Sequence, residues 1–202
     1  MPEPIDGLCT LVLAAGRGSR YREHSDTDKL LAASGPEPGA PTVLAATLAS
    51  VAGVGERLLV VVPVDNRPLR EWLAEAAGGF SAQVLAVHSY GLGQSLAQAV
   101  AVCPARCGWL VVLGDMPYLQ RDSVRRIAAA LEPERLVLPV HRGQRGHPRG
   151  IGAGYRDQLL ALGGDQGAQA LFAGRSVTEV EADDPGVLLD VDRPADRRGF
   201  GG

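Results

Sequence analysis

Apolar residues in this chain gather in short continuous runs, separated by segments in which they recur every three or four positions. The runs have the length of buried strands and lie at 11–13, 57–62, 82–87, 109–113 and 136–140. The segments between them carry helical spacing or helix start and end signals, at 42–51, 68–77, 92–102 and 120–131. Strands that alternate with helices and are apolar throughout predict an α/β fold with a mostly parallel central sheet covered on both faces.

The last third of the chain is less regular. Residues 141–154 are rich in glycine and basic side chains, so we expect a loop or hairpin over the ligand side rather than a core element. Beyond it we expect short helices at 155–162 and 166–173 and short strands at 177–180 and 187–189.

Length and composition fit one domain. The chain has 202 residues, of which 46% are hydrophobic, enough for a sizeable core. We predict a single domain over 1–202, in which 141–175 is an insertion on the acceptor side of the site and 196–202 is a flexible tail. The net charge of −3 argues against a surface that coats nucleic acid. No apolar run approaches the roughly 20 residues that span a bilayer, and the start lacks signal-peptide character, so we expect a cytoplasmic protein.

The three cysteines, an odd number, do not suggest a disulfide framework. Cys103 and Cys107 are four residues apart, which is a metal-ligand spacing, but no matching Cys or His pair follows nearby. Cys9 fits the first strand as a small buried residue.

The loop after the first strand is the main candidate for phosphate binding. Arg20 and Lys29 follow it and supply the positive charge that a triphosphate needs, and Lys29 is the single lysine of the chain. The alternative is a plain turn that needs positive φ. The residues whose small side chains would let amide N–H groups close around phosphate oxygens are Ala14, Ala15, Gly16 and Gly18.

Two common phosphate-binding motifs do not match this loop. A dinucleotide-binding fingerprint needs a third glycine at the position of Tyr21, and a P-loop needs Gly-Lys-Ser/Thr, a tripeptide that the sequence lacks. A dinucleotide-dependent oxidoreductase is therefore disfavoured.

Carboxylates follow strands at the same predicted edge of the sheet. Asp115 comes directly after the 109–113 strand, where a carboxylate is a natural Mg²⁺ ligand, although it could instead cap the next helix. Asp190 and Asp192 are candidates for a second metal-ligating carboxylate, since alternate residues of an extended segment point the same way. The alternative for these two is solvated turn acids.

At this point the chain resembles a known family. Leu13-Ala14-Ala15-Gly16-x-Gly18-x-Arg20, followed by Lys29-Leu30-Leu31, resembles the opening of nucleotidyltransferases with a glycosyltransferase-A-like fold, in the MobA-like NTP transferase superfamily. Leu113-Gly114-Asp115-Met116-Pro117 is similar to the metal-binding strand end of the molybdenum cofactor cytidylyltransferases. The further similar stretches are Gly39-Ala40-Pro41, Gly91-x-Gly93-x-Ser95-Leu96, Arg145-Gly146-His147-Pro148, Gly164-Asp165-Gln166-Gly167-Ala168 and Asp190-Val191-Asp192-Arg193-Pro194.

The resemblance implies a three-layer Rossmann-like nucleotidyltransferase fold and transfer of CMP from CTP to the terminal phosphate of Mo-molybdopterin, with Mg²⁺ as cofactor and pyrophosphate as product. A molybdoenzyme that receives the cofactor is an implied partner. Related guanylyltransferases carry Leu-Ala-Gly-Gly where this chain has Leu13-Ala14-Ala15-Gly16, which favours CTP. The implied roles are catalysis by Arg20, Lys29 and Asp115, nucleotide binding by Gln94, Ser95, Gly114 and the loop residues, acceptor binding by His147 and Asp165, and Mg²⁺ binding by Asp115 and Asp192.

Alternatives remain open within and outside this class. Lys29 comes about four residues later than in the family, so Arg22 is a second candidate for the phosphate role. Arg149 and Gly150 stand where the family runs apolar, which leaves other phosphorylated acceptors as alternatives. Within the same class, guanylyl transfer from GTP is a further alternative. A protein that carries molybdenum cofactor without transferring a nucleotide is the alternative of another class.

Overall fold

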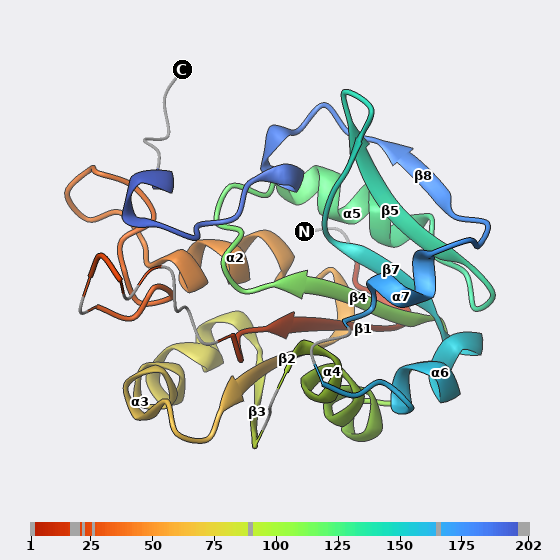
Figure 1. Ribbon diagram of the computed structural model, residues 1–202, viewed down its shortest axis with the longest axis horizontal. Helices are drawn as coiled ribbons and strands as arrows, with labels where there is room; N and C mark the ends of the chain where they lie inside the picture. The colour runs from red at the N-terminus through yellow and green to blue at the C-terminus, as the bar shows by residue number, and fades with distance from the viewer. Residues whose placement is uncertain are drawn as a thin grey trace.

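The computed structural model describes residues 3–16, 21, 23–25, 27–88, 91–164 and 167–197. Within these ranges one mixed sheet of eight strands crosses the molecule in the order β3-β2-β1-β4-β7-β5-β6, and β8 pairs with β5 (Figure 1). The strands are β1 (Ile5–Leu13), β2 (Gly55–Pro63), β3 (Gln83–Val87), β4 (Gly108–Leu113), β5 (Leu136–His141), β6 (Gln144–Arg145), β7 (Arg149–Gly152) and β8 (Thr178–Glu181).

Helices pack on both faces of this sheet. One face is covered by α2 (Val43–Val51), α3 (Arg67–Ala76) and α5 (Arg121–Ala129), and the other by α4 (Leu92–Val102), α6 (Arg156–Leu160) and α7 (Gln169–Phe172). The predicted three-layer α/β fold is confirmed. Short 3-10 turns complete the described elements: η1 (Ala77–Phe80), η2 (Ala153–Tyr155), η3 (Pro185–Leu188) and η4 (Pro194–Asp196).

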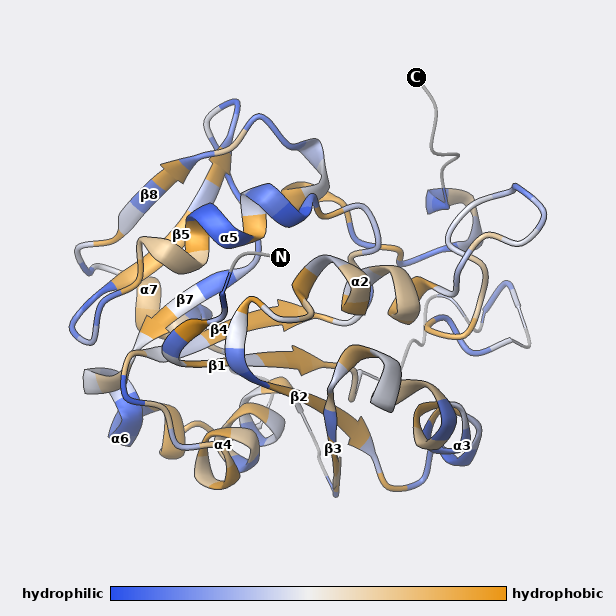
Figure 2. Ribbon diagram, turned by 180° about the vertical axis from the view of Figure 1, so that it is seen from behind, coloured by the Kyte–Doolittle hydropathy of each residue, from blue (hydrophilic) through white to orange (hydrophobic). Residues whose placement is uncertain are grey.

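The central strands are buried on both faces, which explains their unbroken apolar runs. Along β1, Leu8 and Val12 belong to the core under α2 and α5, whereas Leu11 and Leu13 belong to the core under α4. Successive side chains of a strand point to opposite faces, so a strand between two helical layers must be hydrophobic at every position. Figure 2 shows this concentration of hydrophobic residues on β1, β2 and β4.

The parallel part of the sheet brings several strand ends to one edge. β1 is parallel to both β2 and β4, and its last residue, Leu13, is in register with Val61 and with Leu113. Thr42 and Asn66 cap the helices that follow at this side, by accepting the backbone N–H of Ala45 and Leu69. The loops after β1, β2 and β4 therefore meet, as the alternating pattern predicts.

The expectation of a loop or hairpin over 141–154 is wrong for its second half. β7 lies inside the sheet, antiparallel to both β4 and β5. A Cβ on Gly150 would come within 3.2 Å of Leu131 and of Val137, and one on Gly152 would collide with the carbonyl oxygen of Pro133. This strand is thus buried by close backbone approach rather than by large apolar side chains.

The expectation that the cysteines form no disulfide is also wrong. Cys9 of β1 and Cys103, directly after α4, are joined by a disulfide, while Cys107 is a free thiol. Both bonded cysteines are buried, so Cys9 is a core residue as predicted but has a covalent partner.

The remaining C-terminal expectations are partly met. β8 corresponds to the predicted strand at 177–180, but 187–189, expected as a strand, belongs largely to η3. The predicted tail at 196–202 lies mostly outside the described residues. Among the helices that the structure describes, none has the length and apolar character needed to span a membrane.

Candidate active site

Three carboxylates meet at the edge of the sheet where β1 and β4 end. Asp115 follows β4, Asp190 and Asp192 follow η3, and one ligand oxygen from each lies within 4.8 Å of the other two. The backbone N–H of Val191 donates to the carbonyl oxygen of Asp115 at 2.9 Å, which holds the two segments together. Oδ1 of Asp115 is buried and has no hydrogen-bond partner among the residues that the structure describes. A buried carboxylate oxygen of this kind is a natural ligand for a hard cation.

Lys29 lies in the middle of this cluster. Its Nζ is 2.6 Å from Oδ2 of Asp115 and 3.3 Å from Oδ1 of Asp192. Burial disfavours the charged amine, but the attraction of the two carboxylates outweighs it, so the pKa of Lys29 is raised. Burial and repulsion from Asp115 also raise the pKa of Asp190. The predicted catalytic pair, Lys29 and Asp115, is therefore brought into direct contact.

The position of Lys29 is fixed by its neighbours. Oδ1 of Asp28 accepts the backbone N–H of Leu30, and Oδ2 accepts the side-chain amide of Asn66 at 2.6 Å. Asn66 in turn caps α3. This chain of hydrogen bonds ties the lysine loop to the end of β2. No motif in the sequence marks Asp28 or Asn66 as site residues. The signals for them are the place of Asp28 directly before Lys29 and that of Asn66 directly before a predicted helix.

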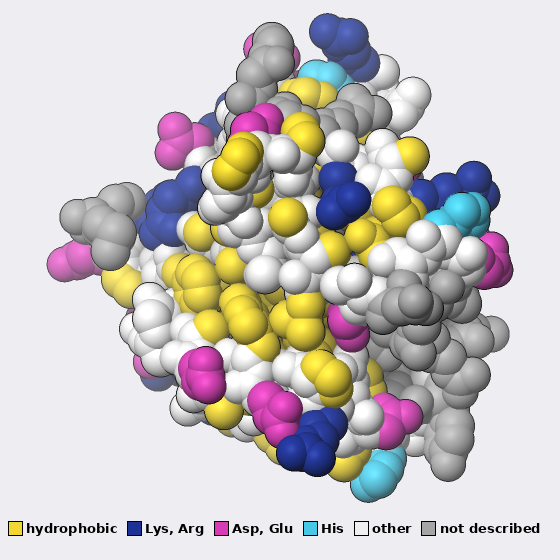
Figure 3. Space-filling model, turned by 90° about the vertical axis from the view of Figure 1, so that its left-hand side faces the viewer, with side chains coloured by type: hydrophobic (Ala, Val, Ile, Leu, Met, Phe, Trp, Pro, Cys, Tyr) yellow, Lys and Arg dark blue, Asp and Glu magenta, His cyan; other side chains and the backbone are white. Residues whose placement is uncertain are grey.

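A cavity of about 230 Å³ opens beside the carboxylates. Figure 3 looks onto the side of the molecule toward which β1 and β4 point in Figure 1, and it shows hydrophobic side chains in the middle with charged ones around them. Small side chains keep this region open. A Cβ atom on Gly114 would lie only 3.2 Å from the side chain of Ala14 and from the carbonyl oxygen of Leu13. The cavity is lined by Leu13, Ala14, Gly16, Asp28, Lys29, Leu30, Asn66, Leu92, Leu113, Asp115 and Asp190.

The loop after β1 differs in one respect from the prediction. The N–H of Ala14 donates to the carbonyl oxygen of Val61 at 2.8 Å, as a continuation of the sheet, so this amide is not available to a phosphate. Ala14 contributes through its small side chain. A Cβ at Gly16 would meet no atom of the described residues within 4 Å, which leaves space for a ligand on the described side of the loop. Gly18, Arg20 and Arg22 lie outside the described residues.

The start of α4 forms one wall of the cavity through Leu92. Ser95 is buried, and its N–H and hydroxyl group both donate to the carbonyl oxygen of Gly91 at 3.1 Å, which stabilises the first turn. Gln94, also predicted to bind nucleotide, is half-buried beside it. The N-terminus of a helix favours negative charge, so this wall suits a phosphate.

His147, the predicted acceptor-binding residue, precedes β7. Its backbone N–H donates to the carbonyl oxygen of Val187 at 2.9 Å, and no described residue forms a hydrogen bond with its buried Nδ1. Burial and the neighbouring charge of Arg149 lower the pKa of His147 to about 4, so the imidazole is neutral at neutral pH. Asp165, its predicted companion, lies outside the described residues.

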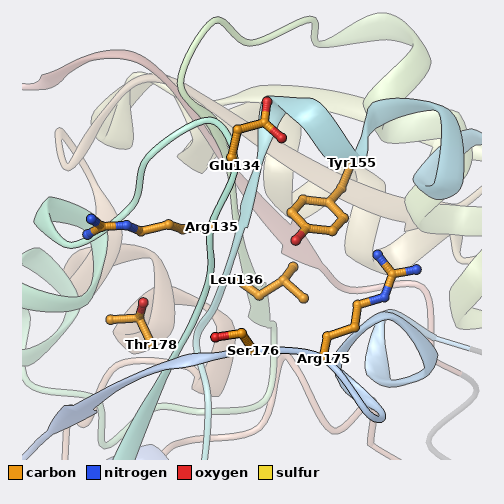
Figure 4. Close-up of a pocket in the computed structure, with 7 residues that line it drawn as sticks. All are labelled: Glu134, Arg135, Leu136, Tyr155, Arg175, Ser176 and Thr178. Atoms are coloured by element: carbon orange, nitrogen blue, oxygen red, sulfur yellow. The ribbon is translucent and has the colours of Figure 1, made fainter.

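A larger cavity of about 450 Å³ lies elsewhere, around Leu136, Tyr155 and Arg175 (Figure 4). Leu136 begins β5, whereas Asp115 follows the end of β4, and both strands are antiparallel to β7 and hence parallel to each other. This cavity is therefore at the opposite edge of the sheet from the carboxylates.

Comparisons with known proteins agree with this geometry. The Rv0371c protein of Mycobacterium tuberculosis is 30% identical, with 97% of this chain and 96% of that chain covered and a TM-score of 0.73. Its complex with manganese has also been solved (27% identity, 94% and 95% covered, TM-score 0.68). A nucleotidyl transferase from Methanothermobacter is 25% identical, with 94% and 93% covered and a TM-score of 0.74.

A curated relative is the bifunctional protein GlmU of Mycolicibacterium gilvum, 30% identical over 185 residues, which are 88% of this chain and 36% of GlmU. The chain thus spans about a third of the length of such relatives. The MobA-like NTP transferase domain family matches residues 10–181. Because this match takes in most of the chain, the protein belongs to that family, and the chain is a nucleotidyltransferase domain.

Proposed function

We propose that this domain transfers CMP from CTP to Mo-molybdopterin in a Mg²⁺-dependent reaction that releases pyrophosphate. The observation that carries the proposal is the cluster of Asp115, Asp190 and Asp192 around Lys29, beside the open loop after β1. Nucleotidyl transfer needs a phosphate-binding surface, a cation and a metal site rather than covalent chemistry from the protein. This edge of the sheet offers all three.

The donor set fits a divalent metal ion. Asp115 and Asp192 would hold it, with Asp190 within reach, and the unpartnered Oδ1 of Asp115 offers one ligand atom. Bound there, Mg²⁺ would neutralise charge that develops on the phosphates. The manganese complex of Rv0371c, a similar chain, supports a divalent metal in this fold.

The residues of this chain would orient the two substrates. Lys29 holds its ammonium group at the carboxylates, where the triphosphate would meet it, and the start of α4 faces the same space. An oxygen of the acceptor phosphate forms a bond to the α-phosphorus of CTP. The bond between the α-phosphorus and its bridging oxygen breaks, and pyrophosphate leaves with that electron pair.

The choice of CTP rests on the loop after β1. Ala15 carries a methyl group where the guanylyltransferases carry glycine, which leaves less room and favours the smaller base. The choice of acceptor rests on the Gly146-His147-Pro148 stretch and on the buried, neutral His147. Arg149 stands in a position where the family is apolar. It therefore favours a different phosphorylated acceptor as the second candidate substrate.

The test is pyrophosphate release with Mg²⁺ or Mn²⁺ and each of CTP, GTP, ATP and UTP, with and without Mo-molybdopterin. We expect release with CTP that requires both the metal ion and the acceptor. Release with GTP alone would move the domain to guanylyl transfer. Release that ignores Mo-molybdopterin but responds to another phosphorylated compound would replace the acceptor.

A carrier of molybdenum cofactor would behave differently. It would bind Mo-molybdopterin tightly, as measured by fluorescence quenching, and release no pyrophosphate with any triphosphate. That combination would overturn the proposal.

A further inference from the structure

Arg149 is a cation on an otherwise apolar face of the sheet. It begins β7 in register with Val111 of β4, two positions before Ile151, which is in register with Trp109. Ile151, Trp109 and Val111 all belong to the core under α4, α6 and α7. Side chains that are in register or two apart share a face, so Arg149 projects from this same face.

The surroundings of Arg149 leave its charge unbalanced. Its guanidinium carbon lies 5.1 Å from the centroid of the Phe172 ring, and its buried Nε has no hydrogen-bond partner among the described residues. In the part of the chain that the structure describes, no carboxylate forms an ion pair with it. The nearest other cation, Arg145, is engaged by Glu179 at 2.6 Å. Burial and the charge of Arg145 lower the pKa of Arg149.

An unpaired, half-buried cation destabilises a fold unless a ligand compensates it. The guanidinium carbon of Arg149 lies over the Phe172 ring, and a guanidinium group carries its N–H donors in a single plane. Paired donors in a plane match two oxygens of an oxyanion. Arg149 therefore has the charge and the donor arrangement that bind an oxyanion.

Arg149 is also in reach of the active site. Leu113, the last residue of β4, and Asp115, which follows the strand, both line the cavity at the carboxylates. At about 3.3 Å per residue, Val111, the register partner of Arg149, is at most roughly 13 Å from Asp115 along the chain, about the span of a small cofactor.

The segment around Phe172 adjoins the cavity as well. The carbonyl oxygen of Gly164 accepts the N–H of Gly93 at 3.0 Å. A Cβ atom on Gly167 would lie 3.8 Å from the Cβ atom of Leu92. Leu92 itself lines the cavity. The segment that carries Phe172 is therefore built onto the same helix start that faces the nucleotide.

We propose that Arg149 binds an oxyanion group of the acceptor substrate, at the end remote from the attacking phosphate. This inference rests on the proposed nucleotidyl transfer, which defines the acceptor. The oxyanion is either a second phosphate group or the oxo-molybdenum group of a loaded cofactor, since both present oxygens to a guanidinium fork in the same way.

The test measures binding of simple oxyanions when the nucleotide site is already filled. The protein is saturated with Mg²⁺ and the non-hydrolysable analogue α,β-methylene-CTP, and sodium phosphate or sodium molybdate is titrated in by calorimetry. We expect Arg149→Leu to weaken binding of at least one ion by about tenfold to hundredfold and Arg149→Lys to weaken it less. The stronger ion shows which oxyanion the site prefers.

Arg175→Leu is the matched control, because the Arg175 guanidinium lies over the Tyr155 ring at 5.4 Å, in the same kind of contact but at the opposite edge of the sheet (Figure 4). It should leave oxyanion binding unchanged. The thermal midpoint of Arg149→Leu should equal or exceed that of the parent, since the variant removes a half-buried charge without a partner; this separates a binding role from a structural one.

The outcomes separate this inference from the proposed function. If the analogue binds to all variants and Arg149→Leu alone loses the oxyanion, the inference stands, whichever acceptor is finally found. Equal oxyanion binding by the parent and Arg149→Leu would overturn it. Failure of the parent to bind the analogue would instead count against nucleotidyl transfer, and the titration is then repeated without it.

Discussion

The proposed nucleotide side and the proposed acceptor side of the candidate site hold their cations in opposite ways. On the nucleotide side, Lys29 is held by Asp115 at 2.6 Å and by Asp192 at 3.3 Å, and its loop is tied down by Asp28. On the acceptor side, Arg149 rests on an aromatic ring, with no ion pair in the described part of the chain. The nucleotide side is thus organised before any ligand arrives, whereas the acceptor side has a charge for a ligand to complete.

The largest change should follow from breaking the organised side at Asp115. Asp115→Asn keeps the shape of the side chain but removes the charge that holds Lys29 and that, in the proposed function, would hold the metal ion. We expect kcat for pyrophosphate release to fall by about 10³-fold or more, roughly 4 kcal/mol of transition-state stabilisation. Steady-state kinetics at saturating CTP would measure it.

Asp65→Asn is the control, because Asp65 is an exposed aspartate in the turn directly after β2, at the same edge of the sheet. Its activity should match the parent. A kcat for Asp115→Asn within a few fold of the parent would show that the carboxylate cluster is not the catalytic centre.

A smaller but global change should follow from opening the disulfide. Cys9 and Cys103 are 94 residues apart in sequence, and their bond joins β1 to the residue directly after α4. A cross-link over such a loop contributes about 2–4 kcal/mol by restricting the unfolded chain. Reduction should lower the free energy of unfolding in urea by that amount.

Two cysteine variants test whether the effect of the reductant on stability comes from the Cys9–Cys103 bond alone. In Cys103→Ala the urea midpoint should no longer respond to reductant, while Cys107→Ala, which removes the free thiol, should respond like the parent. Identical midpoints of the parent with and without reductant would contradict the prediction.

The strands that lead to Lys29 and Asp115 are predictable from the sequence, whereas the strand that carries Arg149 is not. β1, β2 and β4 carry continuous apolar runs because two helical layers cover them, so these runs are visible in the sequence and Asp115 is found from its place after one of them. β7 carries glycine at 150 and 152, which lets it lie against Pro133 and Leu131. A strand buried by the absence of side chains has no hydrophobic pattern to detect.

Pairings over long sequence distances were equally hidden. The Cys9–Cys103 bond and the contact of Lys29 with Asp192 depend on segments far apart in the chain. The carboxylates could be proposed individually from their positions after strands. That Lys29 lies among them, rather than facing only a phosphate, is a property of the folded chain.

The smallest expected effect, on the acceptor side, is a pH dependence that originates at His147. Its pKa in the folded protein is about 4, below the ordinary value of 6.5, because burial and the Arg149 charge disfavour the imidazolium form. Between these values the unfolded chain binds more protons than the folded one, so stability decreases as the pH falls from 6.5 toward 4 and is unaffected above it. The full difference is at most about 3 kcal/mol.

Urea unfolding of the parent and of His147→Gln from pH 4 to pH 7 isolates this contribution, since all other titrating groups are common to both proteins. The free energy of unfolding of the parent should fall more steeply over that range, by up to about 3 kcal/mol relative to the variant. Parallel curves would mean that His147 titrates alike in the folded and unfolded chains. In Arg149→Leu the slope should be smaller than in the parent, because loss of the neighbouring charge lets the imidazole accept a proton at higher pH. The stability curve would then report the same unbalanced charge that the oxyanion titration reports through binding.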